Sequence, residues 1–147
     1  MKRLTSGILA VALLTAACGG IRDGQMATVK TSLYDRLGGK SAITAVVDDF
    51  VGNVAADSRI NRRFQGANIP RLKAMLVDQI CEATGGPCKY TGKSMADTHR
   101  GMGIGDAEFG ALVEDLVKTL DKFKVPTAEK NELLSTLGGM KGQIVGR

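Results

Sequence analysis

The sequence contains few of the residue types that form the commonest kinds of chemical site. Its 147 residues include no Trp, one His and three Cys, and aromatic side chains make up 4% of the chain. The three Cys and the single His do not form a cluster with the spacing of a structural zinc site. Any chemistry that needs an imidazole therefore depends on one residue, His99.

The chain is basic as a whole but has no concentrated block of basic charge. It has 20 Lys and Arg against 15 Asp and Glu, a formal net charge of +5. Beyond the N-terminal Lys2 and Arg3, only Arg62 and Arg63 are adjacent. Neither a basic stripe nor an aromatic stacking platform is present, so we predict no nucleic-acid binding. A hydrophobic share of 44% predicts one globular domain with a buried core.

No hydrophobic run is long enough to cross a bilayer as a helix, which takes about 20 residues. The stretch from Leu4 to Ala17 carries no charge and is rich in apolar residues, follows the basic Lys2 and Arg3, and is typical of a secretory signal peptide. Small residues then precede Cys18. This stretch resembles the lipobox of bacterial lipoproteins, in which the cysteine carries lipid, although the commonest lipobox has Leu where Thr15 stands.

These features predict three segments: a lipoprotein-type signal peptide over 1–17, a flexible tether over 18–31 and a folded domain over 32–147. In this interpretation Cys18 anchors an exported protein to a bacterial membrane, where it faces the periplasm or the cell surface. Two alternatives stay open, namely a plain secretory signal cut nearby and an uncleaved anchor.

The two remaining cysteines, Cys81 and Cys88, lie on either side of the turn over residues 84–87. In an oxidising compartment such an even pair favours a disulfide. The alternative is two unpaired thiols, because a crossing from helix to loop has to meet the geometric limits of the bond.

Helical periodicity dominates from residue 32 onward, and no segment alternates as a strand does. We expect main helices over about 41–56, from a cap at Asn68 to the glycines at 85–86, from a cap at Asp106, and after Pro126. Short helices are expected over 32–37 and after Ser94. The fold class is therefore all-α. A plain bundle is disfavoured because residues 85–105, which include His99, form a long glycine-rich segment of the kind that carries function.

Five motifs, in order, resemble the group 1 truncated haemoglobins over residues 32–146. They are Tyr34-Asp-Arg-Leu-Gly-Gly39, Asp49-Phe50, Phe64, the pattern Gly85-Gly-Pro-x-x-Tyr90-x-Gly92, and the pattern Met95-x-x-x-His99-x-x-Met102-x-Ile104.

This resemblance implies a truncated globin, a two-over-two helical sandwich around haem b. His99 would be the proximal iron ligand, and Tyr34 and Tyr90 would have structural roles. No Cys-x-x-Cys-His motif is present, so covalent c-type haem attachment is not expected. Besides His99, the resemblance places these residues at the haem, where the alternative is ordinary core packing: Phe50, Val51, Phe64, Leu72, Met75, Leu76, Met95, Met102 and Ile104.

The chain departs from the family on the distal side, where a Tyr usually follows the Phe of the second motif and a Gln often stands on the facing helix. Here those positions hold Val51 and apolar residues such as Leu76, and Gln79 is the nearest amide, about one turn further on. A hydrogen bond to bound oxygen contributes about 1.5–3 kcal/mol. Its loss predicts oxygen release that is roughly tenfold to a hundredfold faster. It also predicts poor discrimination against CO and NO.

Two residues of the helix after Asn68 are further candidates for a sixth iron ligand, Met75 by its periodicity and, more weakly, Lys73. The alternative for Met75 is packing, which is its commoner role.

The predicted function is reversible binding of a diatomic gas (oxygen, or NO or CO) by a carrier or storage globin, with no catalytic residues. The alternatives are an NO dioxygenase or weak peroxidase that needs an external electron donor, a haem-based gas sensor or haem-holding protein, and a haem-free structural lipoprotein.

Overall fold

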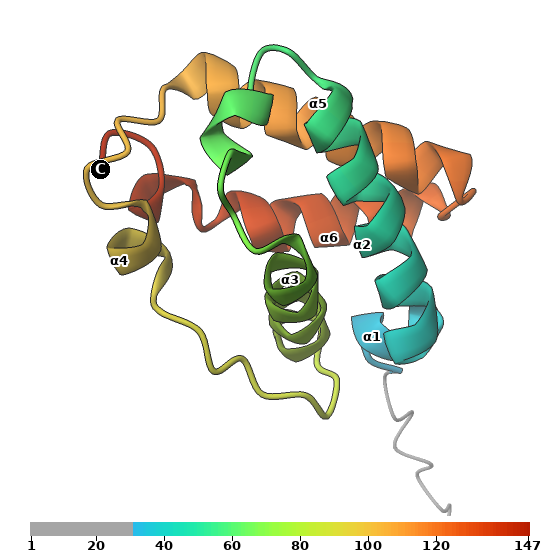
Figure 1. The fold of residues 1–147 in the computed structure, drawn as a ribbon. Helices are drawn as coiled ribbons and strands as arrows, with labels where there is room; N and C mark the ends of the chain where they lie inside the picture. Colours follow the sequence, from blue (N-terminus) through green and yellow to red (C-terminus); the bar gives the residue numbers. More distant parts are fainter. Residues whose placement is uncertain (1–30) are drawn as a thin grey trace, which may run out of the picture.

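The computed structural model describes residues 31–147 of the chain. All regular secondary structure in these residues is helical (Figure 1). The predicted signal peptide, Cys18 and all of the predicted tether except Thr31 lie outside the described residues. Within residues 31–147 there is no strand, so the all-α prediction is confirmed. The elements are α1 (Leu33–Arg36), α2 (Gly39–Ala56), η1 (Asn61–Phe64), α3 (Ile69–Ala83), α4 (Met95–His99), α5 (Asp106–Lys122), α6 (Thr127–Gly138) and η2 (Lys141–Gln143).

The four long helices form two pairs that cross one another. Helix α2 packs against both α3 and α5, and α5 packs against α6. In Figure 1, α5 and α6 run behind α2 and α3, which gives two helices over two. Helix α4 stands apart from these four and contacts η2. No helix in the described part of the chain combines the length and apolar character needed to span a membrane.

Helix α2 occupies the centre of the core because its apolar residues recur on one face. Its buried residues are spaced by one, three or four positions, as an amphipathic helix requires. They are Ile43, Val47, Phe50, Val51 and Val54.

Helix α3 begins as the sequence predicts, whereas α5 does not. The Asn68 side chain accepts a hydrogen bond from the backbone N–H of Arg71 at 3.0 Å, and Pro70 lies in the first turn. Asp106, expected as the cap of the next helix, is instead its first residue, and Gly105 is the N-cap. The carboxylate of Glu108, the third residue of the helix, accepts the backbone N–H of Gly105 at 3.0 Å, which is one half of a capping box. Glycine has no side chain to supply the other half.

The end of α3 is fixed by close contacts with α1 and by a disulfide. The backbone N–H of Tyr34 donates to the carbonyl of Thr84 at 2.9 Å, and Cys81 is bonded to Cys88. A Cβ on Gly86 would lie 2.5 Å from the Tyr34 ring and 2.7 Å from the Cys81 sulfur, so only glycine fits there. The loop that follows leads from the end of α3 to α4.

Candidate functional site

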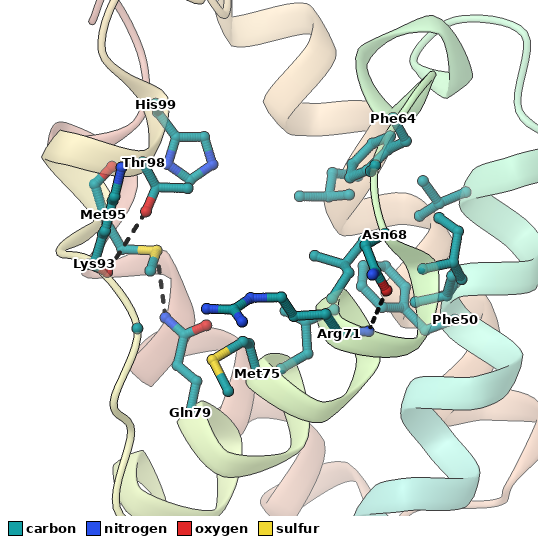
Figure 2. A pocket seen from close by; sticks show the side chains of 18 of the residues that line it. Phe50, Phe64, Asn68, Arg71, Met75, Gln79, Lys93, Met95, Thr98 and His99 are labelled. Atoms are coloured by element: carbon teal, nitrogen blue, oxygen red, sulfur yellow. Dashed lines mark hydrogen bonds between the residues drawn. The ribbon is translucent and has the colours of Figure 1, made fainter.

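A cavity of about 440 Å³ separates α2 and α3 from α4 and the loop before it (Figure 2). Figure 2 shows Met95 and His99 on one side and Phe50 and Phe64 on the other. A volume of this size falls in the range of pockets that hold small molecules and cofactors, about 300–1,000 Å³. Eight of the ten residues expected at the haem line this one cavity: Phe50, Val51, Phe64, Leu72, Met75, Leu76, Met95 and His99.

The other two, Met102 and Ile104, are not among the residues that line the cavity. The chain turns after α4, where Gly101 and Gly103 both have positive φ, at 76° and 58°. The carbonyl of Met102 then accepts a hydrogen bond from Arg63 at 2.8 Å. The backbone of this segment is therefore held at the rim of the site by partners outside the cavity.

The imidazole of His99 has one nitrogen bonded within α4. Its Nδ1 lies 2.8 Å from the carbonyl oxygen of Met95, one helical turn earlier. Because a carbonyl can only accept, Nδ1 carries the proton in this contact. The neutral ring then has its lone pair on Nε2, which is the form that ligates a metal.

Ser94 is the N-cap of the short helix α4. The helix therefore begins at Met95, and His99 follows one turn later. The hydroxyl of Ser94 accepts the backbone N–H of Asp97 at 3.0 Å and donates to the Asp97 carboxylate at 2.7 Å. This cap sets the first turn of a helix that is five residues long. The sequence around Ser94 thus determines where on the cavity wall the imidazole is presented.

Comparison with known proteins decides the family. The sequence model of the family described as bacterial-like globin matches residues 32–145. A group 1 truncated haemoglobin of Mycolicibacterium paratuberculosis is 36% identical over 113 residues, which is 77% of this chain and 83% of that protein. This chain belongs to the group 1 truncated haemoglobins.

Solved truncated haemoglobins have the same fold. The Fe(III) form from Tetrahymena pyriformis superposes with a TM-score of 0.77 at 30% identity, and the match covers 80% of this chain and 100% of that one. The 2/2 haemoglobin of Synechococcus, solved in the cyanomet state with covalently attached haem, gives 0.75 at 32%, over 80% and 100% of the two chains. The predicted two-over-two globin fold is confirmed. Proteins of this family bind haem b and diatomic gases. The predicted cofactor, haem b, and the predicted binding of a diatomic gas are therefore confirmed.

Across the cavity from α4, this truncated haemoglobin has an apolar wall on α2 and α3. Val51, which is 7% exposed, and Leu76 line the cavity at the positions where the family usually has Tyr and often Gln. Leu72 and Met75 extend the same surface along α3. None of these four side chains has an N–H or O–H group to donate to a bound ligand.

Two polar side chains at the cavity, Gln79 and Tyr90, have hydrogen-bond partners within the chain. The Gln79 amide donates to the sulfur atoms of Met95, at 3.3 Å, and Met140, at 3.2 Å. Tyr90, expected from the resemblance in a structural role outside the ligand pocket, also lines the cavity, and its hydroxyl donates to the carbonyl of Lys93 at 2.9 Å. Nearby Gly92 must be glycine, because a Cβ there would lie 2.3 Å from the Tyr90 oxygen.

The sequence did not predict the two cations that line the cavity. Arg71 comes from the first turn of α3 and Lys93 from the loop before α4, and neither forms an ion pair within residues 31–147. Both occur among scattered surface charges in the sequence, so composition and periodicity gave no signal. Together they can bind carboxylate groups at the edge of a mostly apolar ligand.

Seven further residues line the cavity without having been indicated by the sequence, and they come from α2, α3, α4, α5 and the segment before α3. These are Val54, Ala55, Ala67, Asn68, Ile69, Thr98 and Leu112. Val54 and Leu112 could have been found from helical periodicity, because each lies on the inner face of its helix.

Arg63 connects the segment after His99 with η1 on the other side of the cavity through an ion pair and a hydrogen bond. The guanidinium of Arg63, in η1, pairs with Glu108 and holds the pKa of that carboxyl below its usual value, and the Gly105 N–H acts in the same direction. Arg63 also donates to the Met102 carbonyl. One side chain therefore connects η1, whose Phe64 lines the cavity, with the turn that follows His99.

Proposed function

We propose that this globin is a gas carrier or store in which His99 ligates haem iron through Nε2, opposite an apolar distal wall. The observation that carries the proposal is the 2.8 Å contact between His99 Nδ1 and the Met95 carbonyl, which makes Nε2 the nitrogen available to a metal at a cofactor-sized cavity. Haem, when bound, supplies the iron at which oxygen, NO or CO binds.

The cavity has apolar residues that match the porphyrin ring of haem and cationic residues that match its carboxylates. Phe50, Phe64 and Leu76 provide apolar contact surface for a porphyrin. Arg71 and Lys93, which have no ion pair among the described residues, would bind the two propionate carboxylates. The chain's own contribution is thus to hold the cofactor, orient one imidazole and exclude polar groups from the gas-binding side.

The apolar distal wall favours transient oxygen binding over tight retention. Without a donor at Val51 or Leu76, bound oxygen lacks a hydrogen bond that contributes about 1.5–3 kcal/mol when the acceptor is charged. CO and NO depend less on such a bond. The protein is therefore expected to release oxygen fast and to distinguish poorly among the three gases.

Absorption spectra of the ferric, ferrous and CO-bound protein test the proposal. We expect a Soret band that shifts on reduction and on CO binding, and that is lost or strongly weakened in His99→Ala. An unchanged ferrous spectrum in His99→Ala would show that another residue ligates the iron. Repeated NO consumption by the oxygen-bound form, with an added reductant, would indicate a dioxygenase in place of a carrier.

We further propose that the chain is exported and anchored through lipid on Cys18. The small residues before Cys18 and the basic start of the chain support this, and so does the Cys81–Cys88 disulfide, since such bonds are typical of oxidising compartments. Cell fractionation and labelling with a fatty-acid analogue test it. We expect a membrane-bound, labelled protein, and a Cys18→Ser variant that carries no label. Equal labelling of the two proteins would contradict the proposal.

A further inference from the structure

The side chain of Gln79 reaches from α3 to α4 along the edge of the cavity (Figure 2). Its Nε2 lies 3.3 Å from the sulfur of Met95 and 3.2 Å from that of Met140. A thioether sulfur only accepts hydrogen bonds, so the NH₂ end of the amide must face the two sulfurs. The two N–H groups can serve one sulfur each, and the amide joins three segments that are distant in sequence.

This contact matters because α4 is short and the cavity separates it from α3. The helix is five residues long and has no buried residue. Isolated helices of that length are not stable in water, so tertiary contacts must fix its position. Among the hydrogen bonds of the described residues, the one from Gln79 to Met95 is the only side-chain bond that links α3 directly to α4.

Met95 connects this contact to the imidazole. Its sulfur accepts from Gln79, and its carbonyl oxygen accepts the Nδ1–H of His99 at 2.8 Å. The partner of Nδ1 sets the tautomer and the orientation of a metal-binding histidine. A displacement of Met95 would therefore move the one acceptor that keeps the lone pair on Nε2.

A half-buried amide at this place also selects one arrangement of the three segments. If Met95 or Met140 moved away, the N–H groups would lose partners, and an unsatisfied donor away from water is unfavourable. An apolar side chain of similar size would fill the space equally well but would favour no single position of Met95. The amide thus contributes specificity of position in addition to packing.

We propose that Gln79 is a positioning residue for His99, acting through Met95 and braced by Met140. It holds the imidazole with Nδ1 protonated and Nε2 available to the iron. This inference rests on the proposed function, because it assumes that His99 ligates haem.

The test uses the full-length, haem-loaded protein and two spectroscopic readouts. Resonance Raman of the ferrous, ligand-free form gives the iron–histidine stretching band. Solvent exchange of the His99 Nδ1–H, followed by NMR in the diamagnetic CO form, reports the bond to Met95; the chain has one histidine, so the signal is unambiguous. The variants are Gln79→Leu and Met95→Leu, with Gln143→Leu as control, since Gln143 is exposed and its side chain forms no hydrogen bond with any other residue of 31–147.

We expect Gln79→Leu and Met95→Leu to shift or split the iron–histidine band and to speed Nδ1–H exchange. Haem loss should become faster by up to about tenfold, the lower end of what removal of an outer-shell partner costs. The double variant should change the band no more than the larger single change, because both substitutions remove the same bond between Gln79 and Met95. Gln143→Leu should match the wild type.

A Gln79→Leu protein that holds haem with an unchanged band and exchange rate would overturn the inference. If Gln79→Leu does not fold, Met95→Leu and Met140→Leu, which nearly conserve volume, decide the matter in the same way. A wild-type protein that has no iron–histidine band would instead refute the proposed function.

Discussion

Arg63 and Glu108 form a two-pronged ion pair that ties η1 to the first turn of α5. The Nε–Oε1 distance is 2.7 Å and the Nη2–Oε2 distance is 2.9 Å. The same guanidinium donates to the carbonyl of Met102, and the same carboxylate caps Gly105. The pair therefore fixes the turn between His99 and α5 from both sides, which links the stability of that turn to the charge of one carboxyl group.

The first prediction concerns this link and its dependence on pH. The pKa of Glu108 is lowered in the folded protein by Arg63 and by the Gly105 N–H, so the folded state binds a proton less readily than the unfolded state. Its contribution to the free energy of unfolding is present above the ordinary pKa of 4.5 and is lost as pH falls through the lowered value. Urea unfolding should show a smaller acid-induced loss of stability for Glu108→Gln than for the wild type.

The Glu114→Gln variant provides the control for this measurement, because Glu114 pairs with Arg59 on the surface and is more exposed. Other lowered carboxyl groups, including Asp49 and Asp57, keep their own pH dependence in both variants. Parallel pH profiles for Glu108→Gln and the wild type would show that the ion pair does not contribute.

The second prediction concerns the distal wall. A tyrosine at position 51 would place a hydroxyl where the chain now has only methyl groups. We expect Val51→Tyr to slow oxygen release by roughly tenfold to a hundredfold, which corresponds to one hydrogen bond to a charged acceptor. CO release should change much less. Stopped-flow measurement of both off-rates tests this, and Val51→Phe, which adds the ring without the hydroxyl, is the matched control. Equal oxygen off-rates in the Tyr and Phe variants would show that the hydroxyl does not slow oxygen release, and would contradict the prediction.

The third prediction concerns the sixth position of the iron. The structure pairs the Lys73 ammonium with Asp48 at 3.0 Å and does not place Lys73 at the cavity, so it is not a candidate there. Met75 does line the cavity, and packing is the ordinary role of such a residue. We expect a five-coordinate ferrous, ligand-free spectrum that Met75→Leu leaves unchanged. A six-coordinate spectrum that becomes five-coordinate in Met75→Leu would identify the thioether as a ligand.

Residues on regular helical faces were predictable from the sequence, whereas long polar side chains were not. Val51, Leu72 and Leu76 follow from a periodicity of three or four, because burial of one helix face depends on local spacing. Gln79 points where it does because of sulfur atoms 16 and 61 residues away in the sequence, and no local pattern contains that information.

Backbone turns and helix ends limited the prediction in a different way. The expected cap at Asp106 was wrong by one residue: Gly105 is the N-cap, and its N–H is bonded to the Glu108 carboxylate inside the helix. Met102 has the spacing of a residue near His99, but the turn at Gly101 gives it a different environment. Spacing along the chain translates into position in space only while the helix continues.

The fourth prediction concerns the disulfide. Cys81 is fully buried at the end of α3, and its bond to Cys88 closes a loop whose ends are seven residues apart. Loop-closure entropy for a ring of this size contributes about 2–3 kcal/mol to the free energy of unfolding. The double variant Cys81→Ala and Cys88→Ala should lose about that amount in urea unfolding, and a reductant should destabilise the wild type but not the variant. Equal midpoints for the oxidised and reduced wild type would contradict this.

The last prediction concerns the two cations of the cavity. If Arg71 and Lys93 bind the propionates, Arg71→Gln and Lys93→Gln should each lose haem faster than the wild type, and the difference should shrink at high salt, because exposed charge pairs are screened. Transfer of haem to an excess of apomyoglobin measures the rate. Arg62→Gln is the matched control: Arg62 is exposed, lies outside the cavity lining and has no ion pair among the described residues, so its removal changes the net charge alone. If Arg62→Gln and Arg71→Gln accelerate haem loss equally, net charge explains the effect, and the propionates are bound elsewhere.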